Sequence, residues 1–258
     1  MKSFLILFVF SFQLAYSKPI VGYWISYANQ LKFSNKFGIG FDGNYRSVKS
    51  GSITSSVKGQ YTLRVGAHYY FKPDTAKFTF ELGLGYALRQ SAFPFPDPIG
   101  SQKLVMLSDL LHQEHIIWQQ FALGIKISKQ VTSNQRLRIE EIMGPTVNGM
   151  GDERLCLRYL SNSEFLLLKK SRILMPYLSI QDEIHLNIYA PKSVNKFLLA
   201  ENRFTVNMGL RIKKHIRIEV GYLNWYLNND YLNSNWYGNR ISHSLQCQII
   251  QSLNLFRK

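Results

Sequence analysis

Two residues in the C-terminal half of the chain have the types and the spacing of an acid–base or metal-binding pair. Glu183 and His185 lie two positions apart in residues 177–189, where polar and apolar side chains alternate. Successive side chains of a β-strand point to opposite faces, so residues two apart share one face. A carboxylate beside an imidazole can transfer a proton or hold a metal ion. The pair is therefore a candidate for chemistry on a strand.

The other pairs of catalytic residue types do not have the geometry that chemistry requires. His112 and His115 lie three positions apart, which places them on opposite faces of an extended chain. Ser244 and His243 are adjacent and point apart for the same reason. The sequence contains no phosphate-binding loop, no nucleophile elbow and no paired Cys/His motif. We therefore predict no catalytic residue, no metal site and no cofactor.

The larger candidate site is a set of charged residues on the polar faces of several expected strands. Basic side chains outnumber acidic ones on these faces, and rings of Arg and Lys favour anions. An unpaired charge in a narrow interior is costly, so the same charges could instead pair across the interior and fill it. The candidate network is Arg64, Glu81, Glu114, Arg136, Arg138, Glu140, Arg154, Arg158, Glu183, His185, Arg203 and Glu219.

The clearest of the elements that must position these residues is a hairpin from Gly59 to Gln90. Its first half alternates without a break, with Tyr61 and Leu63 on one face and Thr62 and Arg64 on the other. Period-two alternation indicates a strand with one apolar and one polar face. Each half runs to roughly a dozen residues, whereas most soluble strands have about 5–6 and a membrane-crossing strand needs about 9–11.

The same alternation recurs along the chain in about 11 segments, and only residues 164–176 do not follow it. Short connections are expected near 34–36, 72–76, 130–134, 169–174 and 213–214, and long ones near 47–58, 91–112, 145–152, 190–200 and 228–240. Short turns on one side and long loops on the other are the plan of an outer-membrane barrel. We predict an all-β fold, a single antiparallel transmembrane β-barrel of about 10–12 strands with short periplasmic turns and longer extracellular loops.

Two questions remain open at this point. The pattern starts its first strand on the long-loop side, although such barrels usually have an even number of strands. Either one crossing is hidden or the first segment is not a regular barrel strand. A secreted β-sandwich, in which two apolar faces meet, would show the same alternation and is the alternative fold.

The first residues have the pattern of a cleavable export signal. A short basic stretch at Met1–Ser3 precedes an apolar run from Phe4 to Leu14, and small residues stand before Lys18. We expect residues 1–17 to be a signal peptide and residues 18–258 to be the barrel, located in the outer membrane. The two cysteines, Cys156 and Cys247, fall on opposite faces, so we expect no disulfide.

The charge balance is strongly basic. The formal net charge is +15 at pH 7, and removal of Lys2 with the signal leaves +14. Such a balance is typical of proteins that bind a nucleic acid, an anionic surface or an anionic solute. In an exported chain with basic residues dispersed over strands we expect outer-membrane lipid and small anionic solutes as partners, and no nucleic acid. We also expect contact with the barrel-assembly machinery during insertion.

Several segments together resemble a family of Bacteroidota outer-membrane barrels that is catalogued only as a domain of unknown function. The most specific is Glu114-His115-Ile116-Ile117-Trp118-Gln119-Gln120, in which Ile116 stands where the family pattern has Arg. The others include Leu63-Arg64-Val65-Gly66, Gly83-Leu84-Gly85-Tyr86, residues 136–141, residues 154–159 and Gly221-Tyr222-Leu223-Asn224. The resemblance implies a barrel fold and an outer-membrane location, and it implies no activity.

We therefore expect a passive protein, which is either a narrow pore or binding lumen lined by basic residues or a structural barrel. The alternatives are an outer-membrane lipid-modifying enzyme and a secreted soluble β-sandwich that acts as a binding module. An inward Glu/His/Ser cluster near the long-loop rim would favour the enzyme.

Overall fold

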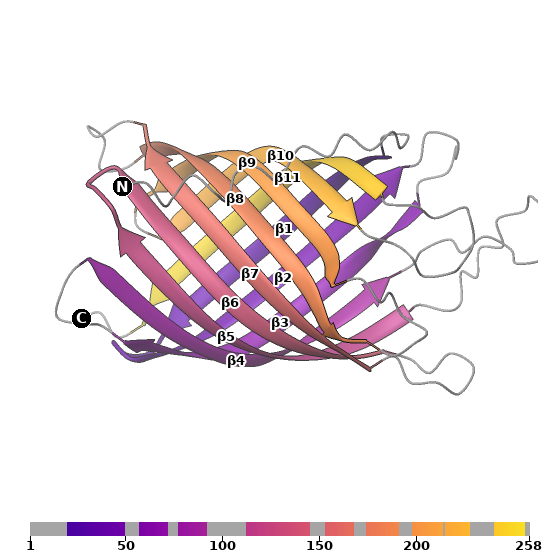
Figure 1. Cartoon of the computed structure of the whole chain (residues 1–258). Helices are drawn as coiled ribbons and strands as arrows, with labels where there is room; N and C mark the ends of the chain where they lie inside the picture. Colours follow the sequence, from indigo (N-terminus) through magenta and orange to yellow (C-terminus); the bar gives the residue numbers. More distant parts are fainter. Residues whose placement is uncertain are drawn as a thin grey trace, which may run out of the picture.

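The computed structural model describes residues 20–49, 57–71, 77–91, 112–144, 153–167, 174–190, 198–213, 215–227 and 240–255. The expected signal peptide at residues 1–17 lies outside these ranges. The described residues form 11 strands in one closed barrel (Figure 1). The strands are β1 (Ile20–Lys32), β2 (Phe37–Lys49), β3 (Val57–Phe71), β4 (Phe78–Ser91), β5 (His112–Lys126), β6 (Val131–Met143), β7 (Glu153–Leu166), β8 (Leu174–Tyr189), β9 (Leu199–Ile212), β10 (Ile216–Leu227) and β11 (Arg240–Asn254).

The barrel closes through a parallel pair. Neighbouring strands are antiparallel from β1 through to β11, and β11 then pairs with β1 in parallel, from Ile20 opposite Ser242 to Lys32 opposite Asn254. When an odd number of strands alternate in direction, the first and the last strand point the same way. The parallel pair therefore explains why the first strand begins on the side of the long loops without a hidden crossing among the described residues.

The connections divide between the two ends as the alternation predicts. The bounds of the strands leave residues 33–36, 72–77, 127–130, 167–173 and 213–215 at one end, which we call the short-connection end. They leave residues 50–56, 92–111, 144–152, 190–198 and 228–239 at the other, which we call the long-connection end. The predicted plan of short connections at one end and longer ones at the other is therefore present.

Two predicted boundaries are wrong, and a stretch without alternation proves to be strand at both of its ends. The turn expected near 130–134 lies at 127–130, because Ser128 Oγ accepts hydrogen bonds from the backbone N–H groups of Gln130 and Val131, both at 3.1 Å. Strand β2 runs on to Lys49 and β3 starts at Val57, so the loop expected at 47–58 is shorter. Residues 164–166 continue β7 and residues 174–176 begin β8, so both ends of the stretch without alternation belong to strands.

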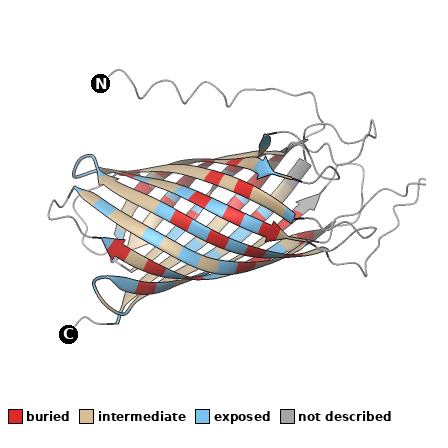
Figure 2. Ribbon diagram, turned by 60° about the horizontal axis from the view of Figure 1, so that its bottom comes forward, coloured by how far each residue is buried: buried red, intermediate tan, exposed pale blue. Residues whose placement is uncertain are grey.

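Large hydrophobic side chains cover the outside of the barrel, and most charged side chains of the described strands face the inside. Leu84 is 57% exposed and Leu63 is 52% exposed, whereas Glu140 is 1% exposed. Buried and exposed residues alternate along the strands (Figure 2). The sandwich alternative is wrong, because the described strands form a single closed sheet rather than two packed sheets.

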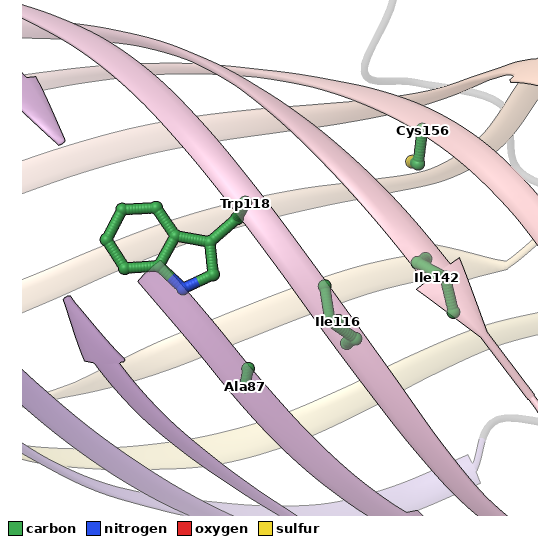
Figure 3. Close-up of a cluster of buried hydrophobic side chains, with 5 residues drawn as sticks. All are labelled: Ala87, Ile116, Trp118, Ile142 and Cys156. Carbon is green, nitrogen blue, oxygen red and sulfur yellow. The ribbon is translucent and has the colours of Figure 1, made fainter. Parts of the chain in front are cut away.

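Apolar side chains also occupy part of the interior. One buried cluster joins Ala87 on β4, Ile116 and Trp118 on β5, Ile142 on β6 and Cys156 on β7 (Figure 3). The indole of Trp118 lies against glycines of the neighbouring strands. A Cβ atom at Gly66 or Gly85 would come within 2.3 Å or 2.4 Å of that ring. The glycine motifs of β3 and β4 therefore make the room that the tryptophan of β5 occupies.

In the part of the chain that the model describes, no helix has both the length and the hydropathy of a membrane span. Both cysteines are free, and Cys156 is buried in the interior.

A charge network across the lumen

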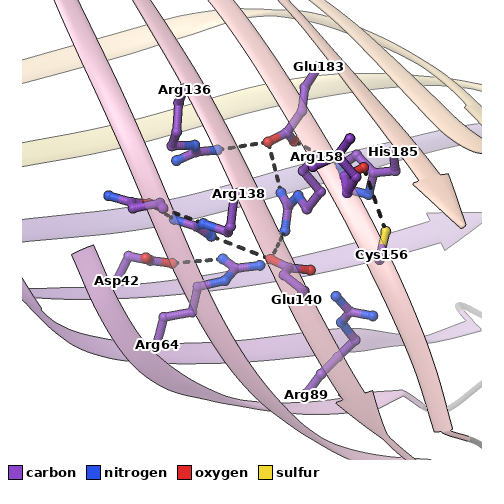
Figure 4. Close-up of polar contacts among 12 residues, drawn as sticks. Asp42, Arg64, Arg89, Arg136, Arg138, Glu140, Cys156, Arg158, Glu183 and His185 are labelled. Carbon is purple, nitrogen blue, oxygen red and sulfur yellow. Dashed lines mark hydrogen bonds and ion pairs between the residues drawn. The ribbon is translucent and has the colours of Figure 1, made fainter. Parts of the chain in front are cut away.

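The centre of the lumen is crossed by alternating arginines and glutamates from adjacent strands. Glu140 on β6 lies 2.5 Å from Arg158 Nη1 on β7 and 3.5 Å from Arg138 Nη1 on its own strand. Arg158 Nη2 reaches on to Glu183 Oε1 on β8 at 2.9 Å, and Arg136 Nη2 reaches the same oxygen at 2.7 Å (Figure 4). All of these side chains are in phase on the inward face of their strands, because they lie two residues apart or directly across the sheet.

The network continues around the wall through β5, β4 and β3. Arg138 donates from Nε and Nη2 to Gln120 Oε1 on β5, at 3.1 Å and 2.7 Å. The Gln120 amide in turn donates to Glu81 Oε1 on β4 at 2.9 Å. His68 Nδ1 on β3 lies 2.7 Å from the same Glu81 oxygen. One glutamine therefore links the arginine cluster of β6 to the acid of β4.

A separate contact holds Arg64. Its Nη1 donates to Asp42 Oδ1 on β2 at 2.9 Å. Figure 4 places the Arg64 guanidinium beside Arg138 and Glu140. Arg64, Arg136, Arg138 and Arg158 therefore gather at one level of the lumen.

His185 joins this cluster to the long-connection end. Its Nδ1 lies 2.6 Å from Glu201 Oε1 on β9, and its Nε2 lies 3.1 Å from Glu183 Oε2. Both ring nitrogens therefore lie near carboxylates, but Nε2 has no hydrogen-bond partner among the described residues.

Glu201 also binds two residues that take part in contacts between guanidinium groups and aromatic rings. It accepts hydrogen bonds from Arg203 Nη2 at 2.8 Å and from the Trp225 indole N–H at 2.5 Å. The Arg203 guanidinium lies 5.0 Å from the ring centre of Trp24. Arg46 lies 3.7 Å from the ring centre of Trp225. Guanidinium groups bind aromatic faces in this way through the ring quadrupole.

Two further clusters lie outside the centre. Toward the long-connection end, Glu114 on β5 binds Arg89 Nη1 at 2.8 Å and also binds Arg154 on β7. Toward the short-connection end, Glu164 on β7 binds Arg211 Nη2 at 2.8 Å and Arg217 Nη1 at 2.5 Å.

The last acid of the network lies on β10. Glu219 accepts a hydrogen bond from the Tyr177 hydroxyl at 2.6 Å and from the Asn207 amide at 3.0 Å. It is therefore held by neutral donors, whereas Glu114, Glu140 and Glu183 are held by guanidinium groups.

The burial of these groups makes their pairing necessary. Arg158 and Glu183 are each 3% exposed, and Arg138 is 5% exposed. Removing a charge from water costs several kcal/mol unless opposite charges and hydrogen bonds compensate. Glu140, Glu183 and Glu164 each lie against at least two cationic groups, which supplies that compensation. The network is therefore a structural part of the wall as well as the lining of the lumen.

The structure places all twelve candidate residues on the inward face but not in one group. The central network holds Arg136, Arg138, Glu140, Arg158, Glu183, His185 and Arg203 by ion pairs, Glu81 through Gln120, and Arg64 beside it. Glu114 and Arg154 pair nearer the long-connection end, and Glu219 lies apart with Tyr177.

Sequence reasoning missed Glu201 and Glu164 as site residues. Glu201 was assigned to the edge of a loop, although it is two positions before Arg203 and so shares its face. Glu164 was assigned to the stretch without a pattern, although it continues the inward series Arg158, Leu160 and Asn162 of β7. Extending each strand by two residues would have found both. Among the described residues, no group of three or more His, Cys, Asp or Glu side chains has the arrangement of a metal site.

Comparisons with known proteins agree with this architecture. Residues 21–235 match the model of a family described as "Protein of unknown function (DUF2490)". No curated protein matches the chain. Among solved structures, the NanC porin is similar over 90% of this chain and 97% of its own, with 10% sequence identity and a TM-score of 0.52. LpxR from Salmonella typhimurium matches over 83% of both chains, with 9% identity and a TM-score of 0.46. The likeness to the porin concerns the barrel fold.

Proposed function

The chain belongs to the DUF2490 family of proteins of unknown function, and on that premise we propose that it is an outer-membrane barrel with a narrow lumen for small anionic solutes. The proposal has two parts, the membrane location and the passage or binding of anions. Each part is supported by a different surface of the barrel.

The outer surface supports the membrane location. Exposed aromatic side chains gather toward both ends, with Tyr23 and Tyr61 near the long-connection end and Phe37 and Phe71 near the short-connection end. Aliphatic side chains such as Leu84 are exposed between them. Two aromatic girdles around an apolar band are the pattern of a lipid-facing barrel. A protein in water rarely exposes so continuous an apolar surface.

The inner surface supports the preference for anions, and the excess of arginine on it is the observation that carries the proposal. The inward arginines are Arg46, Arg64, Arg89, Arg136, Arg138, Arg154, Arg158, Arg203, Arg211 and Arg217, and the inward carboxylates of the described strands are Asp42, Glu81, Glu114, Glu140, Glu164, Glu183, Glu201 and Glu219. A lumen with more fixed cations than anions lowers the energy of a permeating anion. The low exposure of the central residues indicates that the passage is narrow.

The location is tested by fractionation. We expect the mature chain in the outer-membrane fraction, with a mobility on gels that changes on heating, because a closed barrel resists detergent until it is heated. Recovery of the folded chain from the soluble periplasm would contradict the membrane part of the proposal.

The passage of anions is tested by conductance. Purified protein in planar bilayers should give small single-channel steps, with a reversal potential on the anion side in a potassium chloride gradient. A cation preference would overturn the assignment. A silent membrane containing verified folded barrel would identify the protein as a structural barrel instead.

A further inference from the structure

A row of polar side chains interrupts the apolar outer surface on β6, β7, β8 and β9. Gln135 on β6 lies opposite Ser161 on β7, and Ser161 lies opposite Asp182 on β8. All three point outward, since they are in phase with Leu137 on β6 and out of phase with the buried Glu183. Directly across the sheet from Gln135, the outward positions of β5, β4 and β3 are taken by Leu123, Phe80 and Phe71.

Hydrogen bonds connect the members of this row. Gln135 Nε2 donates to Ser161 Oγ at 3.1 Å and to Ser133 Oγ at 2.8 Å, and Gln135 Oε1 accepts from the Tyr159 hydroxyl at 2.5 Å. Asn202 Nδ2 on β9 donates to Asp182 Oδ1 at 2.7 Å. We call the set Ser133, Gln135, Tyr159, Ser161, Asp182 and Asn202 the outer polar row.

The position of the outer polar row would make its contact with lipid energetically unfavourable. Asp182 is at the middle of β8, the longest strand, so it falls near the centre of the hydrocarbon layer if the barrel spans a membrane. Ionisable side chains at such depth are rare on lipid-facing surfaces and usually face protein or water. Polar side chains inside a membrane instead join protein surfaces by hydrogen bonds.

We propose that the outer polar row is the centre of an interface with a second copy of this chain. The inference rests on the membrane location proposed above. At this depth lipid headgroups and soluble proteins do not reach, so the occupant is itself embedded in the membrane.

The hydrogen-bonding groups of the outer polar row can pair with those of the same row in a second copy of the chain. Its hydroxyl and carboxamide groups both donate and accept hydrogen bonds, and its carboxylate accepts them. In a two-fold contact the same patch faces itself, so a hydroxyl or carboxylate of one copy can pair with a hydroxyl of the other. Leu137 and the outward Leu157 and Phe204 surround the row with apolar surface that would pack between the two barrels.

The experiment is cysteine cross-linking in native outer membranes. The test variant is Ser161→Cys in a Cys247→Ser background, which removes the other outward thiol. The matched control is Phe41→Cys in the same background, because Phe41 is exposed on β2 on the other side of the barrel. With a short thiol-reactive cross-linker, Ser161→Cys should give at least several-fold more covalent dimer than Phe41→Cys.

A second variant tests the hydrogen bonds themselves. Adding Asp182→Leu to the Ser161→Cys chain should lower the yield of dimer several-fold while the monomer keeps its heat-modifiable mobility. Equal cross-linking at Ser161 and Phe41 in membrane-located barrel would overturn the interface and leave the location intact. An adduct whose mass is not twice that of the chain would also overturn it, in favour of a different membrane partner. A chain that does not fractionate with the membrane would overturn the location and the interface together.

Discussion

At the scale of single residues, several carboxylates in the lumen each contact more than one guanidinium group. Glu140 is the clearest case, since it lies against both Arg158 and Arg138 and is 1% exposed. A buried carboxylate paired with its partners contributes little net stability to the fold, because the cost of its desolvation offsets much of the attraction between the charges. Its removal is costly, because the guanidinium groups remain buried without it.

We expect Glu140→Gln to lower the free energy of unfolding by about 3 kcal/mol, the cost of leaving a buried charge without its partner. The measurement is urea unfolding of barrel in lipid vesicles, followed by tryptophan fluorescence. The adjacent Glu141 points outward and is exposed, so Glu141→Gln should change the same free energy by less than about 0.5 kcal/mol. Equal effects at the two positions would show that the central ion pairs do not stabilise the wall.

Sequence reasoning located most of these residues but not their grouping. Alternation assigns a face to each side chain, which is why Glu140, Arg158 and Glu183 were placed inside together. It does not assign a height along the barrel, which depends on the register of each strand with its neighbour. The separate placement of Glu219 with Tyr177, and of Glu114 with Arg154, could therefore be known only from the structure.

At the scale of strands, the periodicity of the sequence was sufficient to find each element, and its ends were the weak point. Thr132, Ser133 and Asn134 have the composition of a turn, yet they lie in β6 because Ser128 closes the turn earlier. Pro176 is the last residue of the stretch without alternation, but it stands near the start of β8. Local composition predicts the ends of strands poorly, because pairing with a neighbouring strand can extend a strand through residues that usually favour turns.

The facing of β4 leads to a prediction on the outer surface. Leu84 is 57% exposed on the outside, whereas Thr79 faces the lumen mouth beside Gly124. Leu84→Arg should lower the free energy of unfolding in a bilayer by about 2–4 kcal/mol, and Thr79→Arg by much less. Urea unfolding in vesicles of fixed lipid composition measures both. Equal tolerance would mean that the outer face of β4 does not contact lipid.

The close packing of Trp118 on β5 against the glycines of β3 and β4 leads to another prediction. A Cβ atom at Gly85 would lie 2.2 Å from the Val65 carbonyl oxygen and 2.4 Å from the Trp118 ring. Gly85→Ala should therefore destabilise the barrel by about 1–3 kcal/mol through overpacking. At Gly43 the nearest atom is the flexible Leu63 side chain at 3.2 Å, so Gly43→Ala is the matched control and should be nearly neutral. A neutral Gly85→Ala would show that Trp118 does not lie against β4.

At the scale of the whole molecule, the odd number of strands determines how the barrel closes. The sequence left this question open, since alternation within a strand contains no information about which strand lies beside the first. The parallel β1–β11 pair places the start of β1 at the long-connection end and the end of β11 at the other. The porin-like fold is therefore reached here with one parallel seam.

The seam can be tested with a native cysteine. Ile25 on β1 lies opposite Cys247 on β11, and both are on the outer face. Ile25→Cys should form a disulfide with Cys247 under mild oxidation, visible as altered mobility of the unfolded chain on gels. Tyr27→Cys, which is one step further along the same face and lies opposite Ile249, should react much more slowly. If the two variants oxidise at the same rate, the register of the closing pair is different.

The claim that joins these scales is that the charged network lines a passage for anions, and the most direct test of it is the reversal potential of single channels. In a potassium chloride gradient the unmodified protein should prefer chloride. Glu140→Gln removes one negative charge from the lumen and should move the reversal potential further toward that of chloride, whereas Glu141→Gln on the outside should leave it unchanged. A shift of equal size in both variants, or none in Glu140→Gln channels, would contradict the account.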